Sequence, residues 1–273
     1  MVSATEPKVS GYANNQRWLV ELEGGGSAFV KKATDELTAE WLRQEYRVYQ
    51  SLSPSFSPRL LGWYDDGDLP VLALEDLSEY EWQPPWTRDR VDQVLRTLAE
   101  VAAHPAPPIL RKAREANVGV DSWPEVAEDP EPFLSLGLCS AAWLDRALPI
   151  LLDAGRPEHL DGNALLHLDV RSDNICFRRD GRAIVVDWNL AAVGNPEFDV
   201  AFWLPSLRWE GGPDPEDVAA LSPGVVALVA GFFAARAGLP VIPKAPRVRE
   251  VQLRQLEVAL PWVARALELP PPH

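Results

Sequence analysis

Carboxylate and carboxamide side chains follow two short apolar runs in the middle of the chain. The first run, residues 165–170, leads into a polar turn with Asp169 and Asn174, and the second, residues 183–186, leads into Asp187. Runs of this length suit buried strands, and a hairpin-like arrangement of the two would bring both turns to the same end. Two carboxylates and one carboxamide would then converge, which is a donor set that suits Mg²⁺ when substrate phosphates supply the remaining ligands.

The order and spacing of these residues resemble a known pattern. The motif His167-x-Asp169-x4-Asn174, with Asp187 thirteen residues after Asn174, is similar to the catalytic and metal loops of the protein-kinase-like superfamily. The Asp-Trp pair at 187–188 and the stretch Gly194-Asn-Pro-Glu-Phe-Asp199 are closer to the aminoglycoside phosphotransferase family. The resemblance covers most of residues 10–205.

This resemblance implies roles for the motif residues. Asp169 resembles the catalytic base that orients the acceptor hydroxyl, and Asn174 and Asp187 resemble the Mg²⁺ ligands that bridge the nucleotide phosphates. His167 is expected to brace the catalytic turn, and Asp199 to cap or hydrogen-bond backbone beneath it. Phosphoryl transfer depends mainly on in-line positioning and on neutralising phosphate charge, so it needs little covalent work from the protein.

The N-terminal 76 residues read as strands with one helix. The helix is predicted over residues 36–52, because Leu37, Trp41, Val48 and Leu52 recur at three- and four-residue steps once position 45 is included. Four segments are typical of strands, and a glycine turn joins the first two as a hairpin: residues 17–23, 27–32, 60–64 and 69–74.

A strand lysine and a helix carboxylate are expected on the nucleotide side, since the family uses such a pair to hold the α- and β-phosphates. Lys31 and Lys32 point to opposite faces of their strand, and we favour Lys31 because it follows a Phe-Val pair as in family members. Glu45 interrupts the apolar stripe of the helix, so it should face inward, where a carboxylate needs a cationic partner. A rotated helix would instead leave Glu45 in solvent.

The segment Leu72-Ala-Leu-Glu-Asp-Leu77 resembles the hinge of the family, where backbone groups near Leu74 and Asp76 would meet the adenine. Side chains there do not separate ATP from GTP. A Gly-x-Gly-x-x-Gly loop is missing, and residues 11–16 stand in its place. Small-molecule kinases of this family often lack the full glycine pattern, so activity is still expected.

Beyond residue 88 the pattern becomes helical. Apolar periodicity predicts helices over residues 91–103, 141–152, 225–237 and 248–267. The expected fold is therefore α+β and two-lobed, like a protein kinase: a small antiparallel-sheet lobe with one helix (residues 1–76, binding the nucleotide) and a larger, mainly helical lobe (residues 77–273, carrying catalysis and the acceptor).

Composition narrows the partners. The formal net charge of −14 disfavours nucleic acid as a partner, because that binding needs clustered Lys and Arg. No run of about 18 apolar residues and no signal peptide is evident, so no membrane contact is expected. Two cysteines, Cys139 and Cys176, are too few for a disulfide framework. We expect a cytoplasmic protein, and the sequence leaves its oligomeric state open.

The region after the second turn bears on the acceptor. Only twelve residues separate Asp187 from Asp199, and no Ala-Pro-Glu motif follows, so a protein substrate is disfavoured. The expected function is Mg²⁺- and ATP-dependent phosphorylation of a hydroxyl on a small molecule. The acid excess makes a cationic acceptor, such as an aminoglycoside or other amino sugar, one candidate. Trp203, Trp209 and Glu210 lie where family members often bind the acceptor; the alternative is that Trp203 packs in the core and Glu210 lies in a surface turn. The alternative is a catalytically silent protein of the same fold that binds a nucleotide or other ligand.

Overall fold

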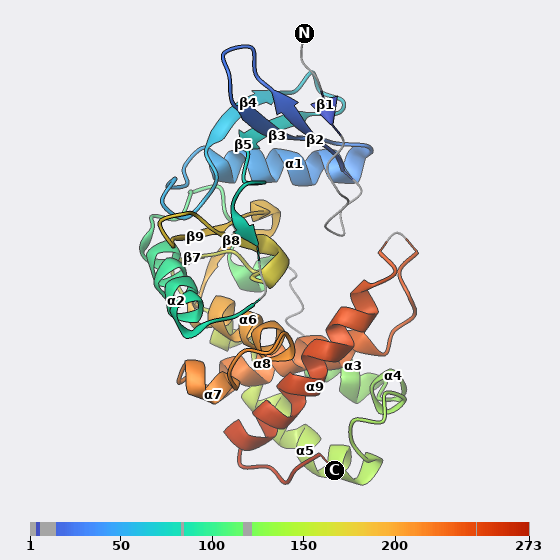
Figure 1. Cartoon of the computed structure of the whole chain (residues 1–273). Coiled ribbons are helices and arrows are strands. Elements are labelled where there is room, and N and C mark those ends of the chain that lie inside the picture. The colour runs from blue at the N-terminus through green and yellow to red at the C-terminus, as the bar shows by residue number, and fades with distance from the viewer. Residues whose placement is uncertain (1–3, 6–14, 83–84, 117–121, 244, 273) are drawn as a thin grey trace.

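The chain folds into a sheet-containing part followed by a larger helical part (Figure 1). The computed structural model describes residues 4–5, 15–82, 85–116, 122–243 and 245–272. The first part is an antiparallel sheet with helix α1 against one face, and the second is mainly helical. This α+β arrangement confirms the predicted fold class. None of the described helices is long and apolar enough to cross a membrane.

The N-terminal sheet has the strand order β1-β2-β3-β5-β4, and all its neighbouring strands are antiparallel. The predicted hairpin of β2 and β3 is present, and its turn uses positive φ angles of 86° at Gly25 and Gly26, which glycine adopts readily. Lys31 pairs with Leu72 of β5, so it lies on a central strand of the sheet. The strands are β1 (Ala4–Thr5), β2 (Gln16–Glu21), β3 (Ser27–Lys32), β4 (Leu60–Tyr64) and β5 (Val71–Glu75).

Helix α1 (Glu36–Tyr49) begins at a capping box. The Asp35 side chain accepts a hydrogen bond from the backbone N–H of Thr38, and the Thr38 hydroxyl accepts one from the backbone N–H of Asp35. These bonds satisfy donors that a helix start leaves without partners. The cap therefore fixes where α1 starts relative to the end of β3.

The buried face of α1 is partly as predicted. Glu45 is buried and faces inward, but Leu37 is 53% exposed, whereas Leu42 is fully buried. The prediction that the apolar stripe begins at Leu37 was therefore wrong. The inward face of the helix is displaced by one residue toward the C-terminus at this end. The helix also ends at Tyr49 rather than at residue 52.

Short strand pairs carry the polar turns of the C-terminal part. The predicted strand over residues 165–170 is wrong beyond Leu166, because Leu168 has a φ of 64°, which no strand accommodates. The predicted pairing is also wrong: β7 pairs with β10, and β9 pairs with β8. The two turns still meet, since the Val186 N–H donates to the Asn174 carbonyl at 3.0 Å. The strands are β6 (Glu81–Trp82), β7 (Ala164–Leu166), β8 (Ile175–Phe177), β9 (Ala183–Val185) and β10 (Ala192–Gly194).

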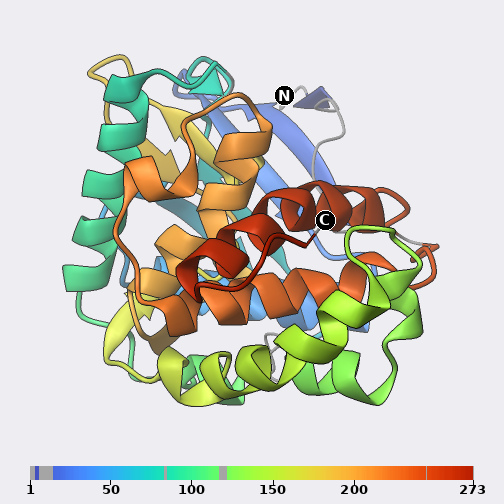
Figure 2. The same ribbon diagram turned by 90° about the horizontal axis from the view of Figure 1, so that it is seen from below.

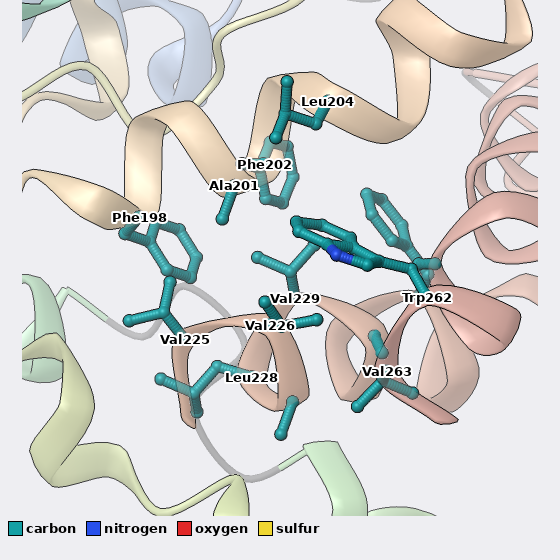
Figure 3. Packing of buried hydrophobic residues seen from close by; sticks show 14 of the residues in the cluster. Phe198, Ala201, Phe202, Leu204, Val225, Val226, Leu228, Val229, Trp262 and Val263 are labelled. Atoms are coloured by element: carbon teal, nitrogen blue, oxygen red, sulfur yellow. The ribbon is translucent and has the colours of Figure 1, made fainter. Parts of the chain in front are cut away.

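The helical part is organised around α8, which is apolar around its circumference and buried along most of its length. Helix α9 lies against α8 (Figure 2), and side chains of α6, α8 and α9 interlock in one core (Figure 3). The α-helices are α2 (Arg88–Ala103), α3 (Ser122–Glu128), α4 (Glu131–Leu134), α5 (Ala141–Ala154), α6 (Glu197–Trp209), α7 (Pro215–Val218), α8 (Pro223–Ala237) and α9 (Val248–Ala266). Short 3-10 helices are η1 (Ala113–Glu115), η2 (Pro157–Leu160), η3 (Ser172–Asn174) and η4 (Trp188–Leu190).

Candidate active site

Lys31 reaches from β3 into a buried cluster with two carboxylates. Its Nζ lies 2.8 Å from Oε1 and 3.0 Å from Oε2 of Glu45 on α1, and 2.8 Å from Oδ1 of Asp187 in the turn after β9. Lys32 is on the opposite face of the strand, so the lysine that pairs with Glu45 is Lys31. The cluster ties the sheet, helix α1 and the second polar turn together.

Lys31 and Asp187 stabilise each other's ionised forms. Burial alone would lower the pKa of Lys31, but Asp187 and Glu45 outweigh it and raise that pKa. Burial would raise the pKa of Asp187, but Lys31 reverses the effect and lowers it to about 2. Burial raises the pKa of Glu45, and Lys31 opposes the rise. Lys31 and Asp187 are therefore both charged at neutral pH.

Asp169 and Asn174 lie together in the first polar turn. The Asn174 side-chain amide donates to the backbone carbonyl of Asp169 at 2.9 Å and to its Oδ2 at 3.1 Å. Burial raises the pKa of Asp169 to about 7, even though Arg171, at 3.3 Å from Oδ2, and Asn174 favour the ionised form. A carboxylate with a pKa near neutrality is matched to accepting a proton from an alcohol.

A buried scaffold holds this turn. Asp199 accepts hydrogen bonds from the backbone N–H groups of His167 and Leu168, at 2.7 and 2.8 Å. The His167 ring lies 2.8 Å from the Val186 carbonyl through Nε2, and its Nδ1 accepts from the Asp169 N–H at 3.2 Å. Burial lowers the pKa of His167 to about 4, so the ring is neutral. This geometry agrees with the bracing roles expected for His167 and Asp199.

The donor set of the two turns fits a hard divalent cation. Asn174 uses its N–H group for Asp169, which leaves its side-chain carbonyl oxygen available to a cation, and Asp187 contacts Lys31 only through its Oδ1. Among the described residues no three His, Cys, Asp or Glu side chains form a metal-binding group. Two protein oxygens with substrate phosphates match the way Mg²⁺ is usually held. Asp187 also has a left-handed backbone (φ 69°, ψ 58°), a conformation that non-glycine residues often keep at functional sites.

The predicted hinge lies at the end of β5. The Leu74 side chain is buried in the N-terminal core, and Asp76 accepts hydrogen bonds from the Ser27 hydroxyl and, at 2.8 Å, from the Ser78 N–H. These side chains thus have structural partners of their own, and contact of the nearby backbone with a base remains a prediction. Residues 11–14 of the segment in place of the glycine loop lie outside the described residues.

A cavity of about 130 Å³ adjoins Asp169, between the first polar turn and helices α6, α8 and α9. Most of its lining was not singled out from the sequence, because it comes from helices far apart in the chain. Its lining residues are Asp169, Arg171, Phe202, Phe232, Phe233, Val248, Val251, Gln252 and Gln255. Arg171 had one available signal, its place inside the His167–Asn174 motif.

The three residues considered for the acceptor side lie outside the lining of this cavity. Trp203 is fully buried, and Trp209 is 44% exposed. Glu210 accepts hydrogen bonds from the Trp86 indole at 2.8 Å and from the Ser172 hydroxyl. None of the three is part of the cavity lining. Glu210 instead anchors the catalytic turn to the end of α6.

Sequence comparison relates the chain to a protein family but to no individual curated protein. The family model described as the phosphotransferase enzyme family matches residues 6–237. No curated protein sequence matches the chain significantly.

Solved structures share the fold across nearly the whole chain. The aminoglycoside phosphotransferase APH(4)-Ia is 14% identical, with a TM-score of 0.60 over 98% of this chain and 94% of that one. A thermostable mutant of that protein, in a ternary complex with AMP-PNP and hygromycin B, is 16% identical with a TM-score of 0.58 over 98% and 94% of the two chains. A putative fructosamine-3-kinase from Haemophilus somnus 129PT is 14% identical with a TM-score of 0.53 over 96% of this chain and 92% of that one. At these identities the similarity establishes the fold.

Proposed function

The chain belongs to the phosphotransferase enzyme family, and from that premise we propose that it transfers the γ-phosphoryl group of ATP to a hydroxyl of a small acceptor. One observation carries the proposal. Asp187, which pairs with Lys31 of β3, and the Asp169–Asn174 pair lie on two turns joined by the hydrogen bond from Val186 to Asn174. Groups that hold phosphates and a group that takes a proton are thereby placed next to each other.

Each residue has a defined task in this proposal. Lys31, fixed by Glu45, binds the α- and β-phosphates, and backbone near Leu74 and Asp76 binds the base of ATP, with GTP not distinguished. Bound to Asn174 and Asp187, Mg²⁺ would neutralise charge on the phosphates.

Asp169 orients the acceptor hydroxyl and receives its proton. The acceptor oxygen then forms a bond to the γ-phosphorus, the bond to the β–γ bridging oxygen breaks, and ADP leaves. In this scheme residues 1–76 form the nucleotide lobe and residues 77–273 supply catalysis and the acceptor site.

Complexes of structural relatives support the substrate types. The APH(4)-Ia mutants are described in ternary complexes with ADP or AMP-PNP and hygromycin B, a nucleotide and a hydroxylated aminoglycoside together. An aminoglycoside is therefore one candidate acceptor, as the net charge also suggested. The silent-protein alternative has less support, because Lys31, Glu45, Asp169, Asn174 and Asp187 all have partners in the expected arrangement.

The substitution Asp169→Asn tests the proposal, because it keeps the shape of the side chain and removes the base. With Mg²⁺·ATP and a panel of small alcohols and aminoglycosides, we expect acceptor-dependent ADP formation to fall at least ~100-fold. The dissociation constant for AMP-PNP, measured by calorimetry, should change less than about threefold, since Asp169 has no task in nucleotide binding. Turnover within about tenfold of the unmodified protein would remove Asp169 from its assigned role.

A further inference from the structure

The cavity beside Asp169 is small and its far wall is apolar. Its volume of about 130 Å³ is close to that of apolar cavities that hold one benzene-sized molecule, roughly 150 Å³. The rings of Phe202, Phe232 and Phe233 contact each other in all three pairs, each with centroids 5.2 Å apart. Mutual contact of this kind fixes the rings, so the wall has a defined shape. Such a wall fits one compact apolar group.

Two amides on α9 supply the polar part of the cavity. The Gln252 carbonyl accepts from Arg249 at 2.8 Å, so its NH₂ group is the part left for a ligand. The Gln255 amide N–H donates to the Ser206 hydroxyl at 2.8 Å, so its carbonyl is the part left. Gln255 is buried, so its orientation is fixed by packing as well as by this hydrogen bond. Helix α9 therefore offers the cavity one donor and one acceptor, both uncharged, while the charged lining groups, Asp169 and Arg171, lie in the first polar turn and pair with each other at 3.3 Å.

The charges around the cavity disfavour an ammonium group at its far wall. Asp169 is the one carboxylate among the described lining residues, and it faces the reacting hydroxyl in the proposed function. Arg249 stands behind Gln252, and the Arg236 guanidinium lies 4.5 Å from the ring centroid of Phe232 while pairing with Glu125 at 3.8 Å. The Phe232 ring is thus already in contact with one cation. A polycation would meet amides and positive charge where it needs carboxylates.

We infer that the acceptor is an uncharged alcohol with one ring-sized apolar part and a second neutral polar atom, and that it is not a polyamine sugar. This inference rests on the proposed function, because it takes Asp169 as the group that meets the reacting hydroxyl. The apolar part packs against Phe202, Phe232 and Phe233, and the second polar atom binds the amides of Gln252 and Gln255. The negative net charge of the chain then belongs to its outer surface and does not indicate a cationic acceptor.

A matched pair of probes tests this inference directly. Cyclohexane-1,4-diol and trans-4-aminocyclohexanol have the same ring and hydroxyl and differ in whether the far group is neutral or charged. Binding is measured by ligand-detected NMR in the presence of Mg²⁺ and AMP-PNP, with hygromycin B as a polycationic probe. We expect the diol to bind at least ~10-fold more tightly than the amino alcohol, because an ammonium group at a partly desolvated wall is unfavourable. Equal or tighter binding of the amino alcohol or of hygromycin B would overturn the inference, as would absence of diol binding.

Variants locate the binding site. Val251→Phe fills the cavity from α9 and should weaken diol binding at least ~10-fold, whereas Ile150→Phe on the exposed face of α5 should leave it unchanged. Gln252→Glu keeps the length of the side chain and adds a carboxylate, so it should reverse the preference in favour of the amino alcohol. If the affinity for the diol is unchanged in both Val251→Phe and Gln252→Glu, the probe binds outside this cavity and the proposal is contradicted.

Failure of the inference and failure of the proposed function give different results. Nucleotide binding is followed separately by titrating AMP-PNP into the unmodified protein and into Lys31→Met. If AMP-PNP does not bind, or binds independently of Lys31, the proposed function fails, whatever the order of the probes. If AMP-PNP binds through Lys31 but the amino alcohol is preferred, the kinase proposal stands and the neutral acceptor is wrong.

Discussion

On the proposed nucleotide side of the site, a lysine and two carboxylates form a largely buried ion cluster, whereas on the proposed acceptor side three phenyl rings and two amides line a small cavity next to Asp169 and Arg171. Each charge of the cluster has a partner within 3.0 Å. The helical wall of the cavity, in contrast, has neutral polar groups and apolar surface. Phosphates are the same in every reaction of a kinase, while acceptors differ in size and charge, and the two sides are built accordingly.

The two sides should also respond differently to substitution. Removing one member of a buried ion cluster leaves another charge buried without compensation, which costs several kcal/mol. Removing one group from a neutral wall loses packing or a single hydrogen bond, which costs less. The predictions below compare the two sides in order of decreasing effect.

The largest effect is expected for Asp187→Ala. This change removes a proposed Mg²⁺ ligand and one partner of Lys31, so acceptor-dependent ADP formation should fall on the order of 10³-fold or more. The dissociation constant for AMP-PNP, measured by calorimetry with and without Mg²⁺, should lose its dependence on Mg²⁺. The control is Asp180→Ala, an exposed carboxylate in the β8–β9 hairpin. Unchanged Mg²⁺-dependent affinity in Asp187→Ala would argue against the metal assignment.

A second prediction concerns stability on the nucleotide side. Lys31→Met leaves the buried Glu45 and the partly buried Asp187 without their shared cation, so the free energy of unfolding in urea should fall by about 3–5 kcal/mol. Lys32→Met, on the opposite face of the same strand, should change it by about 0.5 kcal/mol or less. Equal losses in the two variants would mean that the ion cluster does not stabilise the fold. Adding Glu45→Gln to Lys31→Met should recover part of the loss, because one uncompensated charge is then removed.

The smallest effect is expected next to the acceptor side, at Trp86→Phe. Glu210 would lose the indole N–H but keep the Ser172 hydroxyl, so we expect the free energy of unfolding to fall by about 1–2 kcal/mol. The affinity for AMP-PNP should not change, because the hydrogen bond and ring contacts of Trp86 are to Glu210, Phe177 and Trp203, outside the ion cluster. Trp209→Phe, at an exposed tryptophan, is the matched control. A loss of nucleotide affinity in Trp86→Phe would show that the two sides are coupled, contrary to the comparison.

The sequence by itself singled out the residues of the ion cluster and of the first polar turn. The spacing of Asp169, Asn174 and Asp187 matched a family pattern, and the same resemblance favoured Lys31, which the alternation of a strand only separates from Lys32. Glu45 followed from the period of a helix. These are short-range rules that hold in most contexts. The same rules misplaced the start of the stripe on α1 at Leu37, because the inward face of a helix depends on what packs against it.

Only the tertiary structure decided strand pairing and the acceptor cavity. The run at 165–170 pairs with β10 rather than β9, because the positive φ of Leu168 and the η3 turn redirect the chain before β8 begins. Phe202, Phe232 and Gln252 come from three helices, and no sequence pattern links residues that meet only when α6, α8 and α9 pack together. Periodicity describes one element at a time, whereas a cavity is the space that several packed elements leave between them.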